Sequence, residues 1–133
     1  MEWYLKSAVQ GNAIAQYNIG FMYQTGRGVP KHYSRAMEWY QKAAEQGDAG
    51  AQSNIGYLYQ GGLGVRLGVP KDYSRAMEWY QKAAEQGHAP AQSSIGYLYQ
   101  SGLGVPKDYS RAMEWYQKAV EQGNAEAQFN IGV

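Results

Sequence analysis

The feature that most constrains this chain is that it repeats itself at a nearly fixed period. The segment Asp72–Gly87 recurs as Asp108–Gly123 with one change, and as His32–Gly47 with one change. The four tryptophans, one in each of these copies and one in a partial copy at the N-terminus, step by 36, 40 and 36 residues. Such a period is typical of solenoids, in which each unit buries its apolar face only against its neighbours. The repeat therefore predicts a binding surface rather than an active site.

Each unit contains two stretches with helical periodicity, which we call helix A and helix B. In the second unit, helix A spans Ala49–Gln60 and follows Asp48, a good N-cap. Glycines end this helix, and Pro70 and Asp72 prepare the start of helix B, which runs from about Tyr73 to Gln86. The predicted apolar stripe of helix B consists of Ala76, Trp79, Tyr80, Ala83 and Ala84.

The repeat pattern predicts one domain, residues 1–133, made of three full units and two partial ones. The expected pieces are 1–11 (helix B only), 12–47, 48–87, 88–123 and 124–133 (helix A only). Counting the partial units, we expect an all-α fold of about eight helices arranged as antiparallel pairs. The unit 48–87 carries a four-residue insertion in its A–B loop, where extra length costs little. The alternative is that this loop contacts a partner through Arg66 and Leu67.

The outward side of helix B is expected to be solvated. It carries a glutamate and a lysine four residues apart in each copy, an order that favours weak ion pairs. These pairs are Glu38/Lys42, Glu78/Lys82 and Glu114/Lys118.

Composition argues against several classes of protein. The net charge is +1 and no basic block is present, so nothing favours nucleic acid or a membrane as partner. The absence of cysteine excludes disulfides and thiolate metal sites. No apolar run of spanning length and no signal-peptide pattern is visible, so the chain as written predicts a cytoplasmic protein. Because Met1 falls inside a repeat, a fragment or engineered excerpt of a longer array stays an open alternative.

Residues that could carry chemistry are explained by their places in the repeat. Gly26 and Gly28 recur in every unit and follow no strand, which argues against a phosphate-binding loop. His32 and His88 stand at helix starts where other copies have Asp or Asn, so we expect weaker caps rather than metal ligands. No nucleophile and base are arranged together. We therefore expect no enzyme activity, no cofactor and no metal.

The residues of each unit match a known repeat. The pattern Ala51-Gln52, Ile55-Gly56 and Tyr59 in helix A, with Trp79-Tyr80 and Lys82-Ala83-Ala84 in helix B, resembles the Sel-one-like (Sel1-like) repeat, a relative of the tetratricopeptide repeat. The resemblance implies a right-handed α/α superhelix with helix A on the concave side. Members are mostly adaptors, and those with reported β-lactamase-like activity are typically rich in cysteine. The resemblance thus implies a scaffold for protein–protein interaction.

By resemblance to tetratricopeptide repeats, a second face of helix A is the partner-binding surface. No Lys, Arg, Asp or Glu lies within 13–25, 49–61 or 89–101, so a clamp for a peptide carboxylate is missing. Such a surface suits an apolar or aromatic peptide, or an amphipathic helix. The predicted contact residues are Tyr17, Phe21, Gln24, Ser53, Tyr57, Gln60, Ser93, Tyr97, Gln100 and Phe129.

Two alternatives to this surface stay open. In the first, these side chains merely pack between adjacent A helices. In the second, the chain is a structural element that associates head-to-tail through its uncapped ends, a heterologous contact that can propagate. The partner itself is a protein or peptide that the sequence does not identify.

Overall fold

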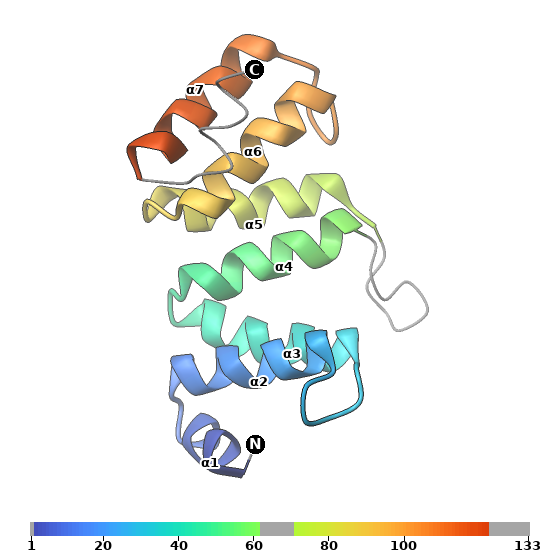
Figure 1. The fold of residues 1–133 in the computed structure, drawn as a ribbon, viewed down its shortest axis with the longest axis vertical. Helices are drawn as coiled ribbons and strands as arrows, with labels where there is room; N and C mark the ends of the chain where they lie inside the picture. The colour runs from blue at the N-terminus through green and yellow to red at the C-terminus, as the bar shows by residue number, and fades with distance from the viewer. Residues whose placement is uncertain (1, 62–70, 123–133) are drawn as a thin grey trace.

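The computed structural model of this chain describes residues 2–61 and 71–122. These residues form seven helices and no strands, stacked in chain order as Figure 1 shows, which confirms the all-α solenoid. The helices are α1 (Glu2–Val9), α2 (Ala13–Thr25), α3 (Tyr33–Glu45), α4 (Ala49–Gly61), α5 (Tyr73–Glu85), α6 (Ala89–Ser101) and α7 (Tyr109–Glu121). The predicted last helix, and the loop insertion with Arg66 and Leu67, lie outside the described residues.

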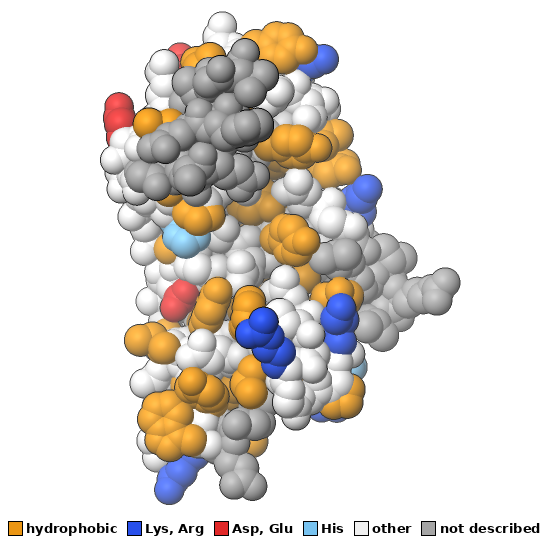
Figure 2. Space-filling model, viewed as in Figure 1, with side chains coloured by type: hydrophobic (Ala, Val, Ile, Leu, Met, Phe, Trp, Pro, Cys, Tyr) orange, Lys and Arg blue, Asp and Glu red, His pale blue; other side chains and the backbone are white. Residues whose placement is uncertain are grey.

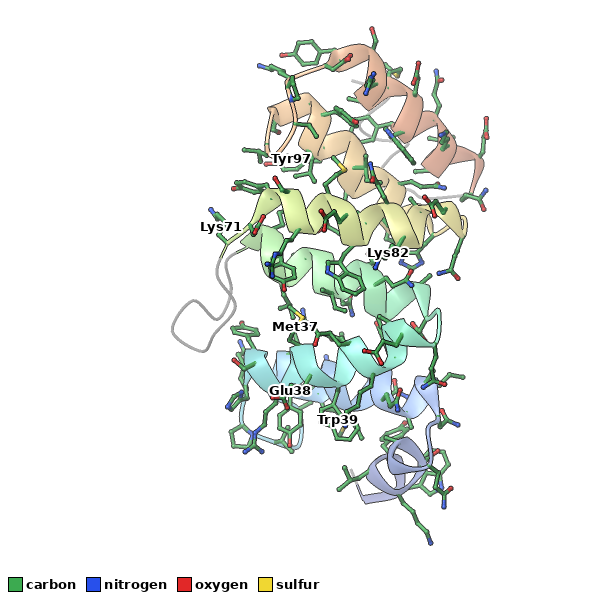
Figure 3. All side chains as sticks on the ribbon, turned by 180° about the vertical axis from the view of Figure 1, so that it is seen from behind. Met37, Glu38, Trp39, Lys71, Lys82 and Tyr97 are labelled. Atoms are coloured by element: carbon green, nitrogen blue, oxygen red, sulfur yellow. The ribbon has the colours of Figure 1, made fainter. Side chains whose placement is uncertain are left out.

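The helices form two layers. Helices α2, α4 and α6 are the A helices and face the viewer in Figure 1, whereas α3, α5 and α7 are B helices and face the viewer in Figure 3. Each A helix packs most closely against the B helix that follows it, and each of α1, α3 and α5 then packs against the next A helix. The short α1 is the B helix of the partial first unit. The core between the layers is therefore distributed along the stack as successive apolar clusters.

Caps set where the helices begin. Asp72 and Asp108 each accept a hydrogen bond from the backbone N–H three residues on, at 3.0 Å. His32 makes the same cap through Nδ1, which accepts from the N–H of Arg35 at 3.2 Å. His88 makes no side-chain cap, and burial lowers its pKa from the ordinary histidine value. Replacement of Asp by His thus preserves the cap geometry at one helix start and loses it at the other.

A tyrosine ring lying on a glycine closes each A–B pair. Tyr80 of α5 is buried, and a Cβ built on Gly56 of α4 would lie 2.8 Å from two of its ring carbons. It would also lie 3.1 Å from the carbonyl oxygen of Ala76, so the two helices approach closely at this point. The other two pairs repeat the contact as Gly20 with Tyr40 and Gly96 with Tyr116. Only glycine leaves room for the ring here.

The sequence predicted Trp79 as part of the buried stripe of helix B, and this prediction is wrong in part. Met77, which that stripe omitted, is buried, and Trp79 is only partly buried. The ring of Trp79 packs against an apolar cluster that α3 of the preceding unit and α4 of its own unit form together. In the first unit, Figure 3 shows Met37 pointing from α3 toward α4 and α5, while Trp39 points to the opposite side. The tryptophan therefore packs at the junction between two units, where the helices of both meet.

The predicted glutamate–lysine pairs of helix B are not formed. Within 2–61 and 71–122, the ion pairs are Arg75–Asp72 and Arg111–Asp108, both at a helix start. The lysine amine instead lies over the tryptophan ring three residues earlier, where the ring face attracts a cation. The distances to the ring centroid are 4.4 Å for Lys42 over Trp39, 4.3 Å for Lys82 over Trp79 and 4.1 Å for Lys118 over Trp115.

Buried glutamines of the A helices bond both to the preceding unit and to the end of helix B in their own unit. The side chain of Gln52 donates from Nε2 to the carbonyl oxygen of Ala44 at 3.3 Å and accepts at Oε1 from Gln86 Nε2 at 2.9 Å. The same two bonds occur one unit earlier, where Gln16 donates to Ala8 and accepts from Gln46. These bonds satisfy polar groups that the junction between repeats would otherwise bury unpaired.

The glycine–tyrosine contact predicts a cost for a single methyl group. Gly56→Ala should lower the free energy of unfolding by about 1–3 kcal/mol, because the added Cβ overlaps the Tyr80 ring in a packed core. Gly50→Ala in the same helix is the comparison and should cost less, since its Cβ would lie 3.2 Å from the ring of Tyr17, which is only partly buried and has room to shift. Urea unfolding of both variants measures the difference. Equal stability of the two would contradict the packing argument.

Candidate interaction surface

Three aromatic rings occupy the same position of successive A helices. Phe21 of α2, Tyr57 of α4 and Tyr97 of α6 are 37%, 50% and 48% exposed. Because the repeat places equivalent residues at equivalent positions, the rings recur along one side of the stack. We call the three rings, together with Gln24, Gln60 and Gln100 of the same helices, the A-helix surface.

The glutamines of this surface are bonded to the core. Gln60 Oε1 accepts a hydrogen bond from the hydroxyl of Tyr80 at 2.6 Å, and Gln100 Oε1 accepts from Tyr116 at 2.6 Å. The hydroxyl of Tyr40 donates to Gln24 in the same way. Burial raises the pKa of the Tyr80 hydroxyl, which keeps it protonated as a donor. The buried tyrosine that touches glycine therefore also positions a glutamine at the surface.

The remaining predicted contact residues differ in how accessible they are. Ser53 and Ser93 are buried between helices and offer almost no surface. Tyr17 is half-buried, stacks on Phe21 with ring centroids 6.3 Å apart, and accepts a hydrogen bond from Asn54 at 3.2 Å. Phe129 lies outside the described residues. The structure thus brings six of the predicted residues to the A-helix surface and places Tyr17 beside it as packing.

The A helices are apolar and uncharged, whereas the loops beside them carry charges. Helices α2, α4 and α6 contain no acidic or basic side chain. Figure 2 shows hydrophobic and uncharged side chains spread over this face, with a few Lys, Arg, Asp and Glu side chains among them. No group of three or more histidine and acidic side chains that could hold a metal occurs in the described part of the chain. None of the helices described is long and apolar enough to cross a membrane.

Sequence reasoning missed the bond between the two layers. It assigned the glutamines to the partner and the tyrosines of helix B to the core, as separate features. The signal that could have joined them is their recurrence together: Gln24, Gln60 and Gln100 each precede one of the core tyrosines, Tyr40, Tyr80 and Tyr116, by 16 or 20 residues.

Comparisons with known proteins agree on the repeat. The sequence pattern of the Sel1 repeat matches residues 13–48, 49–88 and 89–124. A Sel1 repeat protein from Oxalobacter formigenes is 44% identical, with a TM-score of 0.90 over 98% of this chain. The protective antigen c5321 of uropathogenic Escherichia coli is 43% identical, with a TM-score of 0.88 over 96% of this chain. This chain covers 52% of the first of these proteins and 26% of the second.

A more distant structure shares the fold alone. Helicobacter pylori cysteine rich protein B is 23% identical, with a TM-score of 0.72, and the match covers 93% of this chain and 92% of that one. Among the curated proteins no match is found.

The bond between core and surface predicts a specific loss of stability. Tyr80→Phe removes the hydroxyl that donates to Gln60 and should lower the free energy of unfolding by about 0.5–1.5 kcal/mol, the net contribution of one hydrogen bond. Tyr57→Phe is the matched control, because that residue is half exposed and its hydroxyl forms none of the hydrogen bonds found among residues 2–61 and 71–122. Urea unfolding measures both. A change for Tyr57→Phe as large as that for Tyr80→Phe would contradict the assignment.

Proposed function

Because the chain belongs to the Sel1 repeat family, whose repeats generally serve as protein-interaction scaffolds, we propose that it is a non-enzymatic scaffold that binds a peptide or helix of a partner protein. The binding site in this proposal is the A-helix surface. One observation carries it: Phe21, Tyr57 and Tyr97 are exposed at one repeated position of helices that carry no charged side chain. Aromatic anchors of this kind dominate the energy of protein interfaces.

The rest of the fold supports this role. The B helices are nearly identical between units, whereas the A helices differ at several positions. A nearly constant core thus presents a surface that varies along its length. The hydrogen bonds from the core tyrosines hold the surface glutamines in place, which lowers the entropy cost of binding. Such a surface is suited to recognise a partner by its shape and its apolar side chains.

The proposal predicts which rings carry binding. A displayed library of random peptides, selected on the immobilised chain, should yield binders with apolar or aromatic anchors. Tyr57→Ala combined with Tyr97→Ala should weaken these binders by about 2 kcal/mol or more, as loss of central anchors does. The control combines Trp3→Ala with Tyr109→Ala, which removes two exposed rings outside the surface. If the folded Tyr57→Ala/Tyr97→Ala variant bound the selected peptides as tightly as the unmodified chain, the proposal would be wrong.

A second candidate function is head-to-tail self-association. Trp3 of α1 is 72% exposed, whereas each of its equivalents packs against an apolar cluster to which a helix of the preceding unit contributes. Met113 of α7 is 42% exposed, whereas Met37 and Met77 are 7% and 6% exposed. These two faces are the two sides of the contact that joins repeats within the chain. A second copy could therefore continue the stack.

Self-association predicts a molar mass that rises with concentration. Light scattering over a concentration series measures it, and Trp3→Glu combined with Met113→Glu should return the mass to that of one chain. The Tyr57→Ala/Tyr97→Ala variant should associate like the unmodified chain, because its changes lie on another face. A constant monomer mass for the unmodified chain would rule this second function out.

A further inference from the structure

The A-helix surface offers hydrogen-bond donors, the NH2 groups of its glutamines, whose orientation is set by the core tyrosines. The oxygen of Gln60 accepts from the Tyr80 hydroxyl, and that of Gln100 accepts from Tyr116. Each amide oxygen is therefore turned toward the core, and the NH2 group at the other end of the amide is turned away from it. Within 2–61 and 71–122, these two NH2 groups donate to no protein acceptor. The surface thus combines apolar rings with unused donors.

Unused donors distinguish between the conformations that a bound peptide could have. An α-helix satisfies its carbonyl groups internally, so its sides bring few acceptors to such a surface. A β-strand brings carbonyls but also N–H groups that need acceptors, and each amide oxygen here already accepts one bond from a core tyrosine and is turned inward. A polyproline II segment has no internal hydrogen bonds, and each of its prolines carries a carbonyl without an N–H.

The rings favour the same occupant. Phe21, Tyr57 and Tyr97 present exposed aromatic side chains at one repeated position. Proline-rich segments dock on aromatic-lined surfaces of this kind, and their preformed conformation lowers the entropy cost of ordering. The A helices carry no charge, so the rings and glutamines of the surface favour an uncharged segment.

Building on the proposed function, we infer that the A-helix surface binds an uncharged, proline-rich segment of the partner in the polyproline II conformation. The prolines pack on the aromatic rings, and carbonyl oxygens of the segment accept from the NH2 groups of Gln60 and Gln100.

The test removes the donors and keeps the acceptors. Gln60→Glu with Gln100→Glu leaves an oxygen to accept from each core tyrosine but replaces each NH2 by oxygen. The probe is an uncharged proline-rich peptide with blocked ends and a fluorescent label, and its affinity is measured by anisotropy. We expect about a tenfold or greater loss of affinity, as for loss of one to two hydrogen bonds. Gln81→Glu with Gln117→Glu on α5 and α7, both exposed, is the matched control and should bind like the unmodified chain.

A second measurement uses the unmodified chain and so does not depend on the folding of a variant. The side-chain NH2 resonances of Gln60 and Gln100 should shift when the proline-rich peptide is added, while those of Gln81 and Gln117 stay in place. Unchanged resonances of Gln60 and Gln100, or equal affinity of the Gln60→Glu/Gln100→Glu variant, would overturn the inference.

A second probe separates this inference from the proposed function. It is an uncharged amphipathic peptide that forms a helix. If it binds through Tyr57 and Tyr97 and the proline-rich peptide does not, the inference fails and the proposed function stands. If neither peptide binds, the inference also fails, and the library selection alone decides the proposed function. Binding of the proline-rich peptide through Tyr57, Tyr97 and the two glutamines supports both.

Discussion

The contact on which the rest of the structure depends is the one between the core tyrosine of helix B and the glycine of helix A. The ring of Tyr80 lies where a Cβ on Gly56 would be, and this sets how closely α4 and α5 approach. The same residue pair recurs in all three A–B pairs, so the layers keep one spacing along the stack. The Tyr80 ring extends from α5 across Gly56 of α4, and its hydroxyl donates a hydrogen bond to Gln60 of the same helix α4.

This arrangement links stability to the chemistry of the surface. A buried hydroxyl without a partner would cost free energy, and the glutamine on helix A supplies that partner. The glutamine in turn is held with its oxygen inward and its NH2 outward. The orientation of a surface residue that the sequence treats as a free contact is therefore set by the core. The substitution Gln60→Glu keeps an acceptor for Tyr80 and removes the NH2 group, which separates the contribution to stability from the proposed contribution to binding.

The period of the repeat was sufficient to predict the fold class, the helix pairs and the family, because equivalent positions fix periodicity, caps and glycine breaks together. The direction in which individual side chains point was harder to predict from the sequence. Trp79 and Met77 are both apolar residues of helix B, and only packing decides that Met77 is buried while Trp79 reaches the preceding repeat. The lysines stack on tryptophan rather than pair with glutamate, because the ring lies within reach and stays partly exposed. Ser53 shares a helical face with Tyr57, yet a neighbouring helix buries it.

The A helices occupy equivalent positions, but the side chains that lie between neighbouring A helices differ from one junction to the next. Between α2 and α4 the ring of Tyr17 would lie 3.2 Å from a Cβ on Gly50, and its hydroxyl accepts from Asn54. Between α4 and α6 the small Ser53 replaces the tyrosine, and Pro90 stands at the position of Gly50. A large ring thus accompanies a glycine at one junction, and a small side chain accompanies a proline at the next. Tyr57 and Tyr97 flank the junction without the large ring, so the A-helix surface is not the same in both directions along the stack.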